Sequence, residues 1–155
     1  MKYRIVCVGK LKEEFYRKRL EELAKDISKT DSFEMIEVND EKTAENLSPI
    51  EREKILRQEG ERILRYLPSN QKELIVALCI EGKQYSTKEW AEKLHILLEQ
   101  REYEQITYVI GGSLGLDDMV VNRADLKLSF SNMTFPHQLM RVVLAEQILT
   151  VRRYL

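Results

Sequence analysis

Two apolar segments restrict the fold more than any other feature of the sequence. They read LIVALCI (residues 74–80) and ITYVIGG (residues 106–112), and the first contains no polar residue. A strand that is apolar on both sides must be covered on both faces, which is the situation of a strand in a parallel sheet. Three further segments have the β-branched or alternating pattern of strands, and we expect them at residues 3–8, 33–38 and 126–130.

Helix signals separate the expected strands. Ser48 precedes Pro49 and Glu51, and Ser86 precedes Glu89 by three residues, two patterns that are typical of helix N-termini. Strands that alternate with helices predict an α/β fold, in which a mainly parallel sheet carries helices on both faces. The chain has 155 residues, and we expect a single domain over residues 1–155.

Composition and charge exclude several classes of protein. No apolar run approaches the ~20 residues that span a bilayer, so we expect a cytoplasmic protein with no membrane partner. The formal net charge of −1 argues against a wholly basic nucleic-acid binder but is compatible with a local basic patch. Cys7 and Cys79 lie in strand patterns without metal-ligand spacing, which predicts two reduced core thiols and no bound metal.

The loop GGSLGL follows the expected strand at residues 106–112. Its glycines, Gly111, Gly112 and Gly115, do not have the G-x-G-x-x-G spacing of a dinucleotide-binding loop. Adjacent glycines at the carboxyl end of a strand either form a tight turn or let the backbone approach a ligand closely. Lys83 occupies the equivalent loop after residues 74–80, where a solvated lysine is the common case.

His137 and Arg141 stand out in the last helix, which we expect to begin at about Pro136. The positive end of a helix dipole disfavours protonation, so a neutral imidazole is expected at His137. That imidazole either accepts a proton or merely caps its own helix. Arg141 lies one turn later on the same face and needs a partner, because its neighbours are apolar.

The same helix has almost no solvated face, since apolar residues occupy most of its positions from 139 to 149. Such a helix is either central in the core or pressed against another subunit. In a chain of this size we favour the subunit interface, which predicts a homodimer.

Several ordered motifs together resemble one family. VGKLKEEFY, IEGK, VIGGSLGL and LSFSNMTFPHQLMRVVLAEQ are similar to motifs of the bacterial ribosomal large subunit methyltransferase H family, a member of the SPOUT class of S-adenosylmethionine-dependent methyltransferases. The similarity extends from Met1 to about Ile148. It implies a C-terminal trefoil knot, a homodimer, and S-adenosyl-L-methionine held in the knot. The implied reaction is methylation at N3 of a pseudouridine in 23S large-subunit rRNA on assembled ribosomes.

The resemblance also implies a set of site residues. The cofactor-binding residues carried over by position are Leu78, Gly111, Gly112, Phe130, Ser131, Asn132, Met133, Thr134 and Phe135. The catalytic residues are His137 and Arg141, which the resemblance places beside the transferable methyl. His137 would accept the imide proton, and Arg141 would stabilise negative charge on the base or hold a phosphate.

One feature departs from the family pattern. Family members end in a tail that contains Arg-Gly followed by Pro-Tyr-His and reaches the active site, whereas this sequence ends in VRRYL. An alternative is therefore a SPOUT dimer that binds cofactor or ribosome with impaired catalysis. A flavodoxin-like nucleotide protein would share the alternation of strands and helices, but the first loop lacks a phosphate-binding motif.

Basic residues predict where RNA binds. Lys10, Lys12 and Lys83 follow expected strands, and we expect Arg152 and Arg153 to join them in one patch on the cofactor side of the sheet. With a net charge of −1, affinity for free RNA should be weak, so the expected substrate is rRNA already folded in the ribosome.

Overall fold

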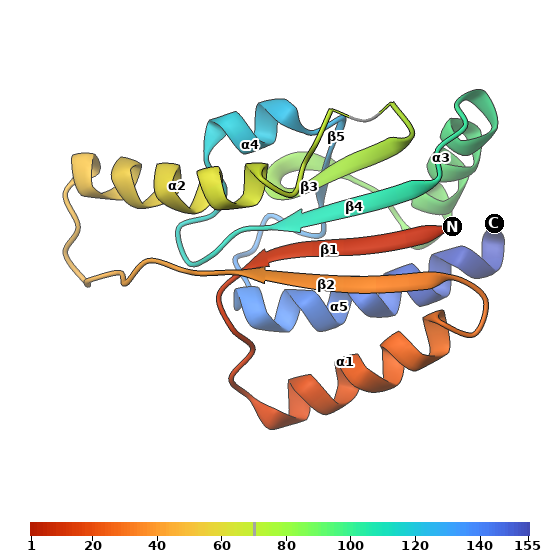
Figure 1. Cartoon of the computed structure of the whole chain (residues 1–155), viewed down its shortest axis with the longest axis horizontal. Coiled ribbons are helices and arrows are strands. Elements are labelled where there is room, and N and C mark those ends of the chain that lie inside the picture. Colours follow the sequence, from red (N-terminus) through yellow and green to blue (C-terminus); the bar gives the residue numbers. More distant parts are fainter. Residues whose placement is uncertain (70) are drawn as a thin grey trace.

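The protein is built on a five-stranded sheet in the order β2-β1-β4-β3-β5, with every neighbouring pair parallel (Figure 1). The computed structural model describes residues 1–69 and 71–155. The strands are β1 (Lys2–Val8), β2 (Ser32–Val38), β3 (Glu73–Gln84), β4 (Gln105–Ile110) and β5 (Leu126–Ser129). The α/β fold and the parallel sheet that the apolar segments predict are confirmed.

Helices cover both faces of the sheet. One face carries α1 (Glu14–Ile27), α3 (Thr87–Gln100) and α5 (His137–Val151), and the other carries α2 (Pro49–Leu64) and α4 (Asp118–Arg123). Side chains of β1 alternate accordingly, since Ile5 and Cys7 pack with the first group whereas Val6 and Val8 pack with the second. No helix within the described ranges is long and apolar enough to cross a membrane.

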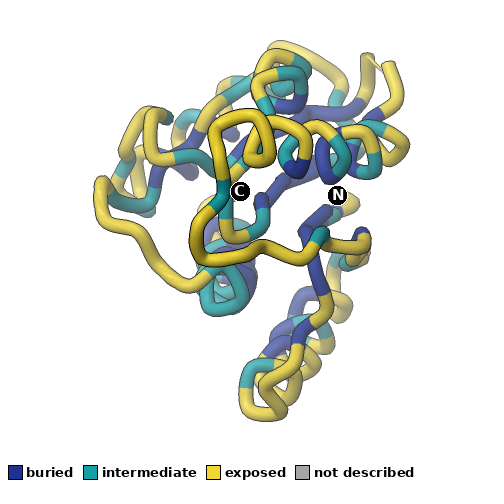
Figure 2. Tube along the Cα trace, turned by 90° about the vertical axis from the view of Figure 1, so that its left-hand side faces the viewer, coloured by how far each residue is buried: buried dark blue, intermediate teal, exposed yellow. Residues whose placement is uncertain are grey.

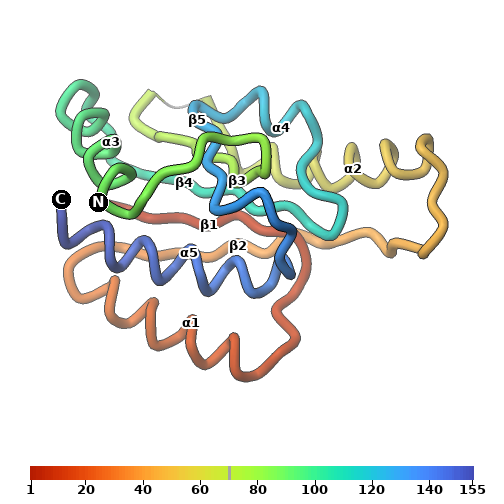
Figure 3. Tube along the Cα trace, turned by 180° about the vertical axis from the view of Figure 1, so that it is seen from behind, coloured from red at the N-terminus to blue at the C-terminus, as the bar shows by residue number. Residues whose placement is uncertain are grey.

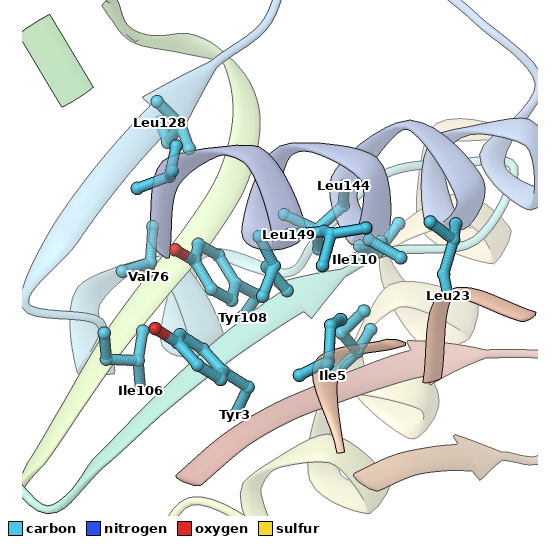
Figure 4. Packing of buried hydrophobic residues seen from close by; sticks show 14 of the residues in the cluster. Tyr3, Ile5, Leu23, Val76, Ile106, Tyr108, Ile110, Leu128, Leu144 and Leu149 are labelled. Carbon is cyan, nitrogen blue, oxygen red and sulfur yellow. The ribbon is translucent and has the colours of Figure 1, made fainter. Parts of the chain in front are cut away.

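The larger core lies between the sheet and α5. Leu144 and Leu149 of α5 pack over Ile5, Tyr108 and Ile110, whose side chains point up from the neighbouring strands β1 and β4 (Figure 4). Figure 2 shows buried residues gathered inside the trace and exposed residues around its outside. The apolar character of α5 is therefore explained mainly by burial within its own chain.

The predicted helix starts are confirmed. Ser48 Oγ accepts the backbone N–H of Glu51, and Pro49 is the first residue of α2. At α3 both hydrogen bonds of a capping box are present. Ser86 Oγ accepts the N–H of Glu89, and the Glu89 carboxylate accepts the N–H of Ser86. The last helix begins at His137, with Pro136 at its cap.

Strand β3 is longer than the apolar segment that predicts it, and it continues through polar residues to Gln84. Leu128 of β5 pairs with Leu78 and again with Lys83, so the residues between those two bulge around the end of β5. Within this bulge, Gly82 lies close to the backbone of Lys127 and Leu128 in β5. An extension held by backbone pairing alone leaves no apolar pattern in the sequence.

Gly82→Ala tests the close packing of β3 against the backbone of β5. The added Cβ would lie 2.8 Å from backbone atoms of Lys127 and Leu128, so β5 must shift. We expect a loss of roughly 1–3 kcal/mol in the free energy of unfolding, as for other overpacked sites, measured by urea denaturation. Gly115→Ala is the control, because no atom lies within 4 Å of its added Cβ and only the backbone φ of +86° opposes it. Unchanged stability of Gly82→Ala would contradict the packing argument.

Candidate active site

A cavity of about 830 Å³ opens at the carboxyl ends of β4 and β5, against residues 78–81 of β3. Because parallel strands all end at one edge, the loops that follow them meet there. The cavity is lined by residues 78–81, 110–116, 118, 121, 127–131, 133–137 and 140. The loop after β4 and the segment between β5 and α5 supply most of its wall.

Almost all the predicted cofactor residues meet at this cavity. The lining includes Leu78, Gly111, Gly112, Phe130, Ser131, Met133, Thr134 and Phe135. Asn132 does not line the cavity, and its Oδ1 instead accepts a hydrogen bond of 3.0 Å from Gln84 Nε2. Asn132 thus ties the loop to the end of β3 in this structure.

The glycine loop is a tight turn whose backbone also lines the cavity. Gly115 N–H donates to the carbonyl of Gly112 at 3.0 Å, and Gly115 has a φ of +86°. A Cβ on Gly111 would collide with the carbonyl of Gly115. The interpretation of these glycines as a tight turn is confirmed, and the close approach to a ligand stays a prediction.

Part of the wall is charged, which was not predicted. Glu81, Asp118 and Lys127 line the cavity beside the glycine turn. Their only signal in the sequence is their position near strand ends, which polar surface residues share. Cys79 also lines the cavity and is half-buried, so the prediction of two core thiols is wrong for Cys79 and confirmed for Cys7.

His137 is the first residue of α5 and lines the cavity. Burial lowers its pKa from the ordinary value, the positive charge of Arg141 lowers it further, and Asp40 opposes the shift. The imidazole is therefore neutral at pH 7, as expected. Burial is the largest cause of the lowered pKa, a contribution that the prediction from the helix dipole did not include.

Arg141 is placed differently from the prediction. Its side chain is 0% exposed and does not line the cavity. The guanidinium donates to Glu37 Oε2 at 2.7 Å, to the carbonyl of Val8 at 2.8 Å and to the carbonyl of Gly9 at 2.7 Å. The partner that a buried arginine requires is thus found within the chain, where both terminal nitrogens of Arg141 are hydrogen-bonded.

The predicted basic patch is only partly assembled. Lys10 and Lys12 are exposed in the connection after β1, at the carboxyl edge of the sheet. Arg152 lies at the opposite edge, where it pairs with Asp31 at 3.0 Å, just before β2. Figure 1 shows the C-terminus at the end of the molecule away from the carboxyl ends of the strands. The prediction that Arg152 and Arg153 join this patch is wrong, because α5 carries them the full length of the sheet.

Comparisons with known proteins agree with this arrangement. A family model described as a predicted SPOUT methyltransferase matches residues 1–152. The ribosomal RNA large subunit methyltransferase H of Carboxydothermus hydrogenoformans is 47% identical over 151 residues, covering 96% of this chain and 91% of that protein. The protein of the same name from Streptococcus pneumoniae is 45% identical over 148 residues, with the same coverage.

The fold and the cavity define the chain as a SPOUT methyltransferase. Within that class, it belongs to the ribosomal RNA large subunit methyltransferase H family.

The titration of His137 checks the electrostatics of the site. We expect an NMR pKa below the ~6.5 of an unperturbed histidine, with His95→Gln used to assign the signal. Because the folded state then binds the proton more weakly than the unfolded state, the free energy of unfolding should fall as the pH drops below about 6.5. A His137 pKa above that value would contradict the burial of a neutral ring.

Proposed function

We propose that the protein transfers a methyl group from S-adenosyl-L-methionine to N3 of a pseudouridine in 23S large-subunit rRNA, acting on ribosomes in the cytoplasm as a single-domain enzyme. The observation that carries the proposal is the convergence of the segments after β4 and β5 and of residues 78–81 of β3 on one cavity, which His137 also lines. The name shared by the relatives, which specifies large-subunit rRNA, supports the substrate class.

The cavity has the properties that this cofactor requires. Its volume of about 830 Å³ lies within the usual range of small-molecule sites. Backbone of the glycine turn and the side chains of Leu78, Phe130 and Phe135 offer an apolar wall with exposed peptide groups, which suits an adenosine. Glu81 and Asp118 supply negative charge for a cofactor that carries positive charge.

The chemistry asks mainly for positioning. S-adenosyl-L-methionine, when bound, supplies a methyl on a sulfonium centre that is electrophilic without a metal. The chain must hold the target base in line with that methyl and accept its imide proton. His137 is proposed as the acceptor, since it is neutral and lines the cavity. Arg141 is proposed to hold the ends of β1 and β2 in place, since it is hydrogen-bonded to Val8, Gly9 and Glu37.

We also propose that the C-terminal part of the chain is knotted. The residues after Leu78 bulge around the end of β5 and lead to α3, which lies on the same face as α5. The chain between β5 and α5 overlaps this connection in the view of Figure 3. A trefoil knot formed there, an exception to the usual rule, would fix the cofactor loops against one another.

The proposed homodimer uses the outer side of α5. Leu139 and Val143 lie one turn apart and are only half-buried in the chain. Phe15 and Phe135, which are 62% and 43% exposed, belong to segments near the start of α5. A twofold contact would cover these apolar groups and bring two cavities close to one interface.

The decisive test of function compares two substrates. With S-adenosyl-L-methionine and intact ribosomes, we expect one new methyl on the target pseudouridine, detected by mass spectrometry of digested rRNA. Protein-free rRNA should react at least ~10-fold more slowly, because a chain with few phosphate contacts gains little affinity from charge alone. Cofactor binding without methyl transfer would instead support the binding-only alternative, and equal rates on both substrates would contradict recognition of folded rRNA.

Val143→Glu tests the dimer. A charge at the centre of an apolar contact should separate the subunits, because it would be buried without a partner. Sedimentation at micromolar concentration should show a dimer for the native protein and a folded monomer for the variant. Ile96→Glu is the matched control, since Ile96 is an apolar residue of α3 that is 50% exposed. A native monomer under these conditions would overturn the proposed interface.

A further inference from the structure

The buried guanidinium of Arg141 organises a loop rather than the cavity. Its three acceptors are a carboxylate of β2 and two carbonyls at the end of β1, contributed by Glu37, Val8 and Gly9. A fully buried charge is costly unless it is paired and hydrogen-bonded. The cost is offset only when the end of β1, the end of β2 and α5 are held together.

Glu37 is the centre of this arrangement. Its Oε2 atom accepts Arg141 Nη1 at 2.7 Å and also accepts the backbone N–H of Leu11 at 2.8 Å. Two more bonds fix the same connection, because Gly9 N–H donates to the carbonyl of Val38 at 2.8 Å and Lys12 N–H donates to Gln138 Oε1 at 3.1 Å. The backbone of residues 9–13 is thus bound to both β2 and α5.

The side chains on this fixed backbone are basic and exposed. Lys10 and Lys12 point into solvent, while Leu11 between them is buried. The loop is bonded to Gln138, the residue next to His137, and Figures 1 and 3 show it passing the first turn of α5. Two lysines are therefore held beside the rim of the cavity at which the target nucleotide must arrive.

We propose that Glu37 is a positioning residue: through Arg141 and the N–H of Leu11 it holds residues 9–13 as a preformed surface for RNA phosphates beside the cavity. The inference rests on the proposed function, because it assigns this loop to the same rRNA substrate. A preordered loop loses less conformational entropy on binding than a flexible one, which matters most for a chain with a net charge of −1. Its contribution should be sensitive to salt, as binding to phosphates is.

Three substitutions separate this role from a general effect on stability. Glu37→Ala removes both bonds, whereas Glu37→Gln keeps a carbonyl oxygen that can accept from Leu11 and Arg141 and loses only the charge. Glu34→Ala is the matched control, because Glu34 lies on the same strand and makes an exposed pair with Arg4 at 3.0 Å. For each protein we would measure cofactor affinity, and kcat and KM with intact ribosomes across a salt series.

Glu37→Ala should raise KM for ribosomes by roughly 10-fold, with kcat within about twofold, because groups that bind phosphates position the substrate without taking part in the chemistry. Cofactor affinity should be unchanged. The salt dependence of KM should become shallower by roughly 0.7 in log–log slope for each phosphate that the loop no longer neutralises. Glu37→Gln should lie between Glu37→Ala and the native protein, and Glu34→Ala should match the native protein. A fall in kcat or cofactor affinity at unchanged KM would overturn the inference.

A double-mutant cycle keeps the test decisive if Glu37→Ala is poorly folded. In a Lys10→Ala and Lys12→Ala background, Glu37→Gln should raise KM no further, since the groups that it positions have already been removed. An additive effect would show that Glu37 acts elsewhere.

Hydrogen exchange tests, without an activity assay, whether Glu37 and Arg141 hold residues 9–13 in place. Residues 9–13 should exchange faster in Glu37→Ala than in the native protein, while residues 111–116 stay unchanged. If the native protein transfers no methyl group, the proposed function is wrong. If residues 9–13 exchange at an unchanged rate in Glu37→Ala, only the proposed positioning role of Glu37 is wrong.

Discussion

All five strands run in one direction, and the rest of the molecule depends on this constraint. Parallel strands end at a common edge, so every loop that follows a strand is delivered to the same side. The glycine turn after β4 and the segment after β5 meet there around the cavity. Helix α5 starts at this edge and runs back beneath the sheet, which buries Leu144 and Ile148 and holds the cavity wall against the core.

Much of this arrangement follows from local sequence signals. The strands at residues 74–80 and 106–112 could be predicted because burial on both faces favours apolar side chains at nearly every position, with Thr107 as the buried polar exception. Ser48 and Ser86 could be predicted as helix N-caps because the first N–H groups of a helix need acceptors. A neutral imidazole at His137 could be predicted from its position at a helix start, although burial is the largest cause of its lowered pKa. Each inference uses only neighbours within a few residues along the chain.

The features that could not be predicted depend on partners far apart in the sequence. Arg141 and Glu37 are separated by 104 residues, and nothing local to either indicates the pair. The extension of β3 to Gln84 is held by backbone pairing with β5, which requires no apolar pattern and restricts side-chain size only at Gly82. The position of Arg152 was beyond prediction for a related reason, since it depends on the length of α5 and on Asp31 at the far edge.

One side chain links the basic loop to the chemistry of the cavity. The charge of Arg141 lowers the pKa of His137, and its hydrogen bonds hold the connection that carries Lys10 and Lys12. Because the carboxylate of Glu37 lies 2.7 Å from the guanidinium, much of that charge is balanced, which is consistent with burial as the larger cause of the shift at His137. The pair can therefore order the loop strongly while it tunes the imidazole only modestly. Its hydrogen bonds are made to the loop and to β2, whereas its effect on the pKa of His137 is one of charge alone.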